Sequence, residues 1–69
     1  MDCVLRSFDV VKDGNVLSHY ELFKRGCTRE VRTTTEVIFT GAYADQEYKS
    51  CLETNKTIAS MIGAEVIEK

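Results

Sequence analysis

The chain has 69 residues, of which 43% are hydrophobic and 29% charged, with a net charge of −2 at pH 7. A chain of this length buries a marginal core, so we expect one domain over residues 1–69 that gains stability from another source, such as a partner subunit. The sequence has no apolar run long enough to span a membrane, and "MDCVLRSFDV" at its start lacks the apolar segment of a signal peptide, so we expect a cytoplasmic protein without a membrane partner.

The cysteine pattern argues against both a disulfide framework and a metal site. Cys3, Cys27 and Cys51 are odd in number and form no C-x-x-C pair, and the chain has a single histidine. We therefore expect free thiols in a reducing compartment, with no metal and no cofactor. A partner subunit then becomes the expected source of extra stability.

Two apolar runs joined by Asp13-Gly14 predict a β-hairpin with strands at Cys3–Val11 and Val16–Lys24. Asp-Gly is favoured in two-residue type I′ turns, where both residues take positive φ, and counting outward from the turn fixes the register. On one side the expected opposing pairs are Val4–Phe23, Arg6–Glu21, Phe8–His19 and Val10–Leu17. On the other side they are Leu5–Leu22, Ser7–Tyr20, Asp9–Ser18 and Val11–Val16.

The segment Glu30–Thr40, rich in β-branched residues, predicts a third strand after a loop at Arg25–Cys27. Its apolar and threonine side chains alternate with polar ones, and Ile38 alone breaks the alternation. The alternating set is expected to join Phe8, Leu17 and Phe23 in the core, and it comprises Val31, Thr33, Thr35, Val37 and Phe39.

From Ala44 the apolar spacing becomes three and four residues, which predicts a helix over residues 44–62 ended by Gly63. Its stripe contains Ala44, Tyr48, Cys51, Leu52, Asn55, Ile58, Ala59 and Ile62. "AEVIE" after Gly63 predicts a short last strand. The expected fold class is α+β with two layers: an antiparallel sheet of three to four strands (β-hairpin, strand, helix, short strand) and one helix packed on one face.

One helix covers only one face of such a sheet, so the second face is predicted to be an uncovered apolar surface. Scattered apolar residues are common on protein surfaces, but several of these are cross-strand neighbours, and a contiguous patch marks an interface. We therefore expect a non-enzymatic protein-binding module of inhibitor or adaptor type, which forms a homodimer through this face or a sheet edge. The candidate protein-binding residues are Leu5, Val11, Val16, Tyr20, Leu22 and Ile38.

The alternative is a nucleic-acid-binding module, because a cationic two-stranded ribbon can contact phosphates or enter a major groove. The candidate residues are Lys24, Arg25, Arg29 and Arg32. Against this alternative, the chain is acidic overall and Glu30 interrupts the segment. An enzyme ranks third and no catalytic residue is predicted, because nucleophilic catalysis needs a base beside the nucleophile and the one histidine, His19, lies in mid-strand.

Overall fold

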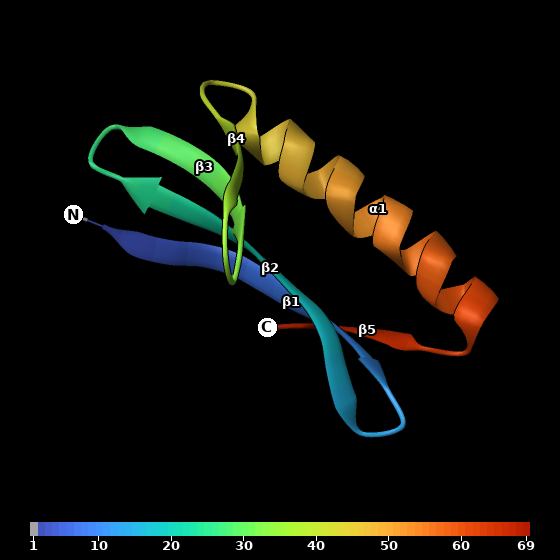
Figure 1. The fold of residues 1–69 in the computed structure, drawn as a ribbon. Helices are drawn as coiled ribbons and strands as arrows, with labels where there is room; N and C mark the ends of the chain where they lie inside the picture. Colours follow the sequence, from blue (N-terminus) through green and yellow to red (C-terminus); the bar gives the residue numbers. More distant parts are fainter. Residues whose placement is uncertain (1) are drawn as a thin grey trace.

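The computed structural model describes residues 2–69, which form a five-stranded sheet and one helix (Figure 1). The elements are β1 (Cys3–Lys12), β2 (Asn15–Arg25), β3 (Thr28–Thr33), β4 (Val37–Thr40), α1 (Ala44–Ile62) and β5 (Glu65–Glu68). Neighbouring strands are antiparallel in the order β4-β3-β2-β1-β5, and α1 crosses one face of the sheet from the β4 edge to the β5 edge. The α+β class is confirmed, but the sheet has five strands rather than three to four.

The first turn has the predicted chemistry. Asp13 has a φ of 53° and Gly14 a φ of 79°, so both residues occupy the left-handed region that a type I′ turn requires. Val11 lies opposite Val16 beside the turn, as predicted. The Asp-Gly pair therefore sets the start of the ladder.

Farther along the hairpin, the predicted register is wrong because two β-bulges interrupt the ladder. Leu17 in β2 and Leu5 in β1 have no opposing residue, and between these bulges every pair is shifted by one position. Phe8 therefore lies opposite Tyr20 rather than His19. Because successive side chains in a strand point to opposite faces, this shift moves Tyr20 and Leu22 onto the face of Phe8.

The predicted third strand, Glu30–Thr40, is in fact two strands joined by a tight turn. The Thr33 N–H donates to the Glu36 carbonyl at 2.8 Å, and the N–H groups of Thr35 and Glu36 donate to Thr33 Oγ1 at 3.3 and 3.2 Å. Threonine hydroxyls favour such turns by accepting local backbone hydrogen bonds. The chain reverses here, and β4 folds back on β3.

The turn between β2 and β3 has two residues, Gly26 and Cys27, rather than the three predicted. The shorter turn places Leu22 opposite Val31. A third bulge follows in β4, where Ile38 has no opposing residue. Ile38 was the residue that broke the predicted alternation.

The core lies between α1 and the sheet face that it covers, which we call the helix face. The buried apolar side chains from both layers are Phe8, Val10, Leu22, Val31, Ala44, Tyr48, Leu52 and Ala59. Leu17 and Phe23 are not in this core as predicted, since Leu17 is 52% exposed and Phe23 lies on the other face. Tyr20 packs against the core in their place, with its ring 5.0 Å from that of Phe8.

Helix α1 has the predicted bounds and ends at Gly63, whose φ of 74° lies in the left-handed region. The last strand is also confirmed, and β5 pairs with the end of β1 nearest the first turn. Within residues 2–69, no helix combines the length and the apolar character needed to cross a bilayer.

Candidate protein-binding site

The structure does not bring the six predicted protein-binding residues onto one surface. Leu22 is only 3% exposed and lies in the core on the helix face, and Tyr20 packs against that core. Val16 is exposed near the end of the first hairpin, opposite the half-buried Val11. The two others, Leu5 and Ile38, are exposed bulge residues in different strands.

The sheet face away from α1, which we call the open face, carries paired charges where an apolar patch was predicted. At one end of this face, Asp9 is 7% exposed, and its carboxylate lies 2.6 Å from His19 Nδ1 and 2.7 Å from Lys69 Nζ. Hydrogen bonds from Lys69 and then His19 hold the pKa of Asp9 below its ordinary value of 3.8, against the opposing effect of burial. His19 lies in β2 and Lys69 directly follows β5, so the two partners approach this buried acid from the two sides of β1.

A second set of ion pairs surrounds Phe23 at the other end of the open face. Arg32 Nε lies 2.8 Å from Glu21 Oε1, and Arg25 Nε lies 3.2 Å from Glu30 Oε1. The guanidinium carbons of Arg32 and Arg25 lie 3.6 and 5.2 Å from the centre of the Phe23 ring. These cation–π and ionic contacts cover the Phe23 ring, whereas other apolar side chains on this face, such as Val4 and Val37, remain about half exposed.

The four residues predicted for nucleic-acid binding do not form one cationic surface either. Arg25 and Arg32 belong to the open face, whereas Lys24 and Arg29 alternate to the helix face. Arg29 Nη1 lies 2.6 Å from Asp45 Oδ2, so three of these four cations face a carboxylate partner.

An apolar groove lies between α1 and the β3–β4 side of the sheet. We define this helix–strand groove by five residues that line it: Tyr20, Ile38, Phe39, Cys51 and Ile58. Ile38 is 47% exposed and Ile58 46% exposed, so large aliphatic side chains from the sheet and from the helix meet water here. Of the six predicted protein-binding residues, Tyr20 and Ile38 line this groove.

The groove exists because α1 presents a wider apolar stripe than the sheet buries. Tyr48, Leu52 and Ala59 are buried, whereas Ile58 and Ile62, from the same stripe, are 46% and 42% exposed. Because the helix was predicted to pack on the sheet through this stripe, Ile58 was not predicted as a site residue. Ile58 lies at one side of this stripe, and that position was the signal that could have indicated partial exposure.

Cys51 forms part of the groove wall and is half-buried. Burial raises the pKa of its thiol, although a hydrogen bond with Asn55 Nδ2, which lies 3.5 Å from Sγ, acts in the opposite direction. A thiol with a raised pKa is less nucleophilic at neutral pH. This cysteine therefore acts as a small apolar wall residue.

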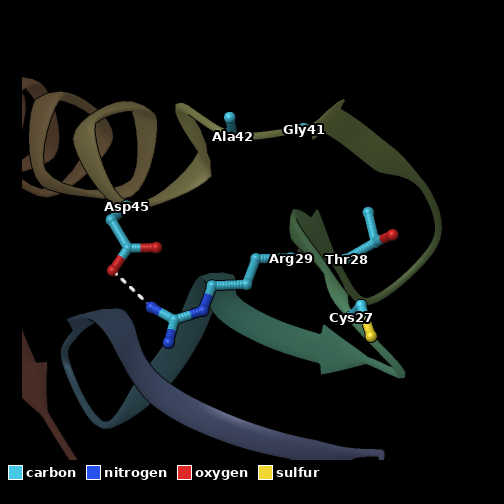
Figure 2. Close-up of a pocket in the computed structure, with 6 residues that line it drawn as sticks. All are labelled: Cys27, Thr28, Arg29, Gly41, Ala42 and Asp45. Carbon is cyan, nitrogen blue, oxygen red and sulfur yellow. Dashed lines mark hydrogen bonds and ion pairs between the residues drawn. The ribbon is translucent and has the colours of Figure 1, made fainter.

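A second, more polar pocket lies at the start of α1 (Figure 2). Its lining residues are Cys27, Thr28, Arg29, Gly41, Ala42 and Asp45. The Arg29–Asp45 ion pair crosses one side of it, as the dashed line in Figure 2 shows. Its two charged side chains therefore neutralise each other, and no histidine lines it.

The described part of the chain contains no group of three or more His, Cys, Asp or Glu side chains that could hold a metal ion. Comparison of the sequence with protein-family models and with curated proteins, and of the fold with solved structures, finds no match.

Proposed function

We propose that this chain is a non-catalytic protein-binding module of inhibitor or adaptor type, which receives apolar side chains of a partner protein in the helix–strand groove. The observation that carries the proposal is the exposure of Ile38 and Ile58, at 47% and 46%, in a groove between an edge strand and a helix. Grooves of this kind bind extended segments by strand addition, in which edge hydrogen bonds give affinity and side-chain pockets give specificity.

The lining of the groove suits an apolar ligand bordered by polar groups. Tyr20 and Phe39 add aromatic surface to the floor, while Glu47, Ser50 and Thr54 line it from the helix. Protein-binding sites commonly have an apolar centre and a polar rim. No ion pair among residues 2–69 engages Glu47, so its carboxylate can face a cation on the partner.

Two features support a binding role over catalysis. His19 is the one histidine in the chain, and its Nδ1 faces the Asp9 carboxylate on the open face, away from the groove. The thiol in the groove, that of Cys51, has a raised pKa.

The three free cysteines support a reducing, cytoplasmic location. Self-association belongs to the same proposal.

The test is affinity purification from the native host with three baits: the wild type, Ile58→Asp and Met61→Asp. Met61 is 79% exposed on the same helix but does not line the groove, so it provides a matched apolar-to-acid control. We expect the wild type and Met61→Asp to enrich the same protein and Ile58→Asp to lose it, because a carboxylate in the groove would be desolvated by an apolar partner.

Circular dichroism of each variant establishes that the baits are folded before capture is compared. An enriched protein that binds Ile58→Asp and the wild type equally would overturn the groove as the binding site. Absence of any enriched protein would count against the binding function itself.

A further inference from the structure

The two outer strands of the sheet differ sharply in how they are protected against pairing with another chain. β5, at one edge, has Glu65 and Glu68 at its ends, so two antiparallel copies of β5 would bring glutamates close together. β4, at the other edge, reads Val37–Thr40 and contains no charged residue and no proline. Charged residues and proline often blunt natural edge strands, and β4 has neither, so its short length and its bulge are the features that restrict pairing at this edge.

The outer edge of β4 borders the helix–strand groove. Ile38 and Phe39 are adjacent in β4, and both line the groove. The bulge at Ile38 accounts for this, because two successive residues of a bulged strand can point to the same side. Val37 is 51% exposed, so β4 has apolar surface outside the groove as well.

We propose that a second copy of this chain occupies the β4 edge, with the two β4 strands antiparallel about a two-fold axis. This pairing places uncharged residues opposite uncharged residues throughout, and it brings Ile38 of one copy against Phe39 of the other over the two grooves. Ile58 of each copy covers these side chains from the helix layer. The inference rests on the proposed binding role of the groove, and it identifies a second copy of the chain as the molecule that fills the groove when the protein is purified alone.

Sedimentation equilibrium of the purified chain from about 1 to 500 μM tests the inference, with Ile38→Lys and Ile67→Lys as a matched pair of variants. Both isoleucines lie in edge strands, and they are 47% and 43% exposed. We expect the wild type and Ile67→Lys to approach twice the 7.8 kDa chain mass as concentration rises. Ile38→Lys should weaken dimerisation on the order of tenfold or more, because each dimer would bury two like charges.

A charge swap distinguishes a direct contact from a general loss of solubility or folding. Ile38→Lys and Ile38→Glu should each be monomeric alone, and an equimolar mixture should recover dimer mass because opposite charges then meet across the axis. A mixture that stays monomeric would overturn the β4 pairing.

Two further outcomes would also overturn the inference: a wild type that remains at 7.8 kDa throughout the range, or an equal loss of dimer in Ile38→Lys and Ile67→Lys. If the chain is monomeric but Ile58→Asp still abolishes capture of another protein, self-association fails and the proposed function stands. The two proposals therefore fail separately.

Discussion

At the scale of single residues, the most constrained groups are carboxylates that are buried on a sheet face without a covering layer. Asp9 is 7% exposed and Glu30 is 5% exposed, and burial of an ionised acid is costly unless it is paired. Asp9 has two close partners, whereas Glu30 Oε2 lacks a hydrogen-bond partner among residues 2–69 and has Arg32 only at 3.9 Å. Asp9 is therefore the more closely paired of these two buried acids.

We predict that the wild type loses stability in acid in a way that Asp9→Asn does not. The folded-state pKa of Asp9 lies below its ordinary value of 3.8, so its contribution is fully present above that pH and is lost as the pH falls through the lower folded-state pKa. At pH 7, Asp9→Asn should lower the free energy of unfolding by about 1–3 kcal/mol, because charge-assisted hydrogen bonds are lost.

Urea unfolding from pH 7 to pH 2 measures this effect, with Asp13→Asn as the control. Asp13 is an exposed turn residue without an ion pair among residues 2–69, and asparagine tolerates its positive φ. The Asp13→Asn profile should follow the wild type. An Asp9→Asn profile with the wild-type acid slope would contradict the role given to Asp9.

Tyr48 carries a second residue-scale prediction, since its ring is 1% exposed and its hydroxyl has no hydrogen-bond partner in the described structure. Removing a buried, unsatisfied hydroxyl should leave stability unchanged or raise it by up to about 1 kcal/mol, so Tyr48→Phe should be at least as stable as the wild type. Tyr48→Ala should cost about 3–5 kcal/mol, because it removes a buried ring. Thermal unfolding of both variants checks this, and a clearly destabilised Tyr48→Phe would show that the hydroxyl is bonded.

At the scale of secondary structure, the bulges explain which parts of the fold could be predicted from the sequence. Turn chemistry and helical spacing are local, so the Asp13-Gly14 turn and helix α1 were predicted correctly. The bulges could not be predicted, because each occurs at two adjacent apolar residues, a valine followed by leucine or isoleucine, either of which could face the core. These pairs are Val4-Leu5, Val16-Leu17 and Val37-Ile38. The same doublet at Val66-Ile67 lies in a regular ladder, so the doublet alone does not decide the register.

We predict that Leu22→Ala costs far more stability than Leu17→Ala. Leu22 is 3% exposed in the core, and truncation of a buried leucine costs about 2–5 kcal/mol. Leu17 is 52% exposed at a bulge, and its truncation should cost less than about 1 kcal/mol. Urea denaturation of the two variants measures the difference. Equal costs would favour the unbulged register, in which Leu17 rather than Leu22 faces the core.

At the scale of the whole molecule, the candidate surfaces could be predicted only in part, because a change of register redistributes side chains between two faces. The open face, predicted to be an uncovered apolar surface, carries ion pairs around Asp9 and Phe23 beside exposed apolar side chains. Of the six predicted residues, only Tyr20 and Ile38 line the proposed site. The four cations of the alternative hypothesis also divide between the two faces. The spacing of these residues along the chain does not show on which face each apolar or cationic side chain lies.

For nucleic acids, we predict only weak retention that disappears with salt. Carboxylates neutralise Arg25, Arg29 and Arg32, so few counterions would be released from DNA or RNA on binding. Fluorescence anisotropy with a labelled duplex from 20 to about 200 mM salt measures both the affinity and the salt slope. Tight binding at about 150 mM salt would place the nucleic-acid hypothesis ahead of protein binding.

The crossing of α1 from one sheet edge to the other has a consequence for the order of folding. Strands β1 to β4 pair with their chain neighbours, whereas β5 returns to β1, and Arg6 meets Glu68 across 62 positions of sequence. Closing so long a loop is entropically slower than forming adjacent hairpins. The meander can therefore assemble on the ribosome while its apolar face is still bare, and the nascent chain remains prone to aggregation until the last third has emerged.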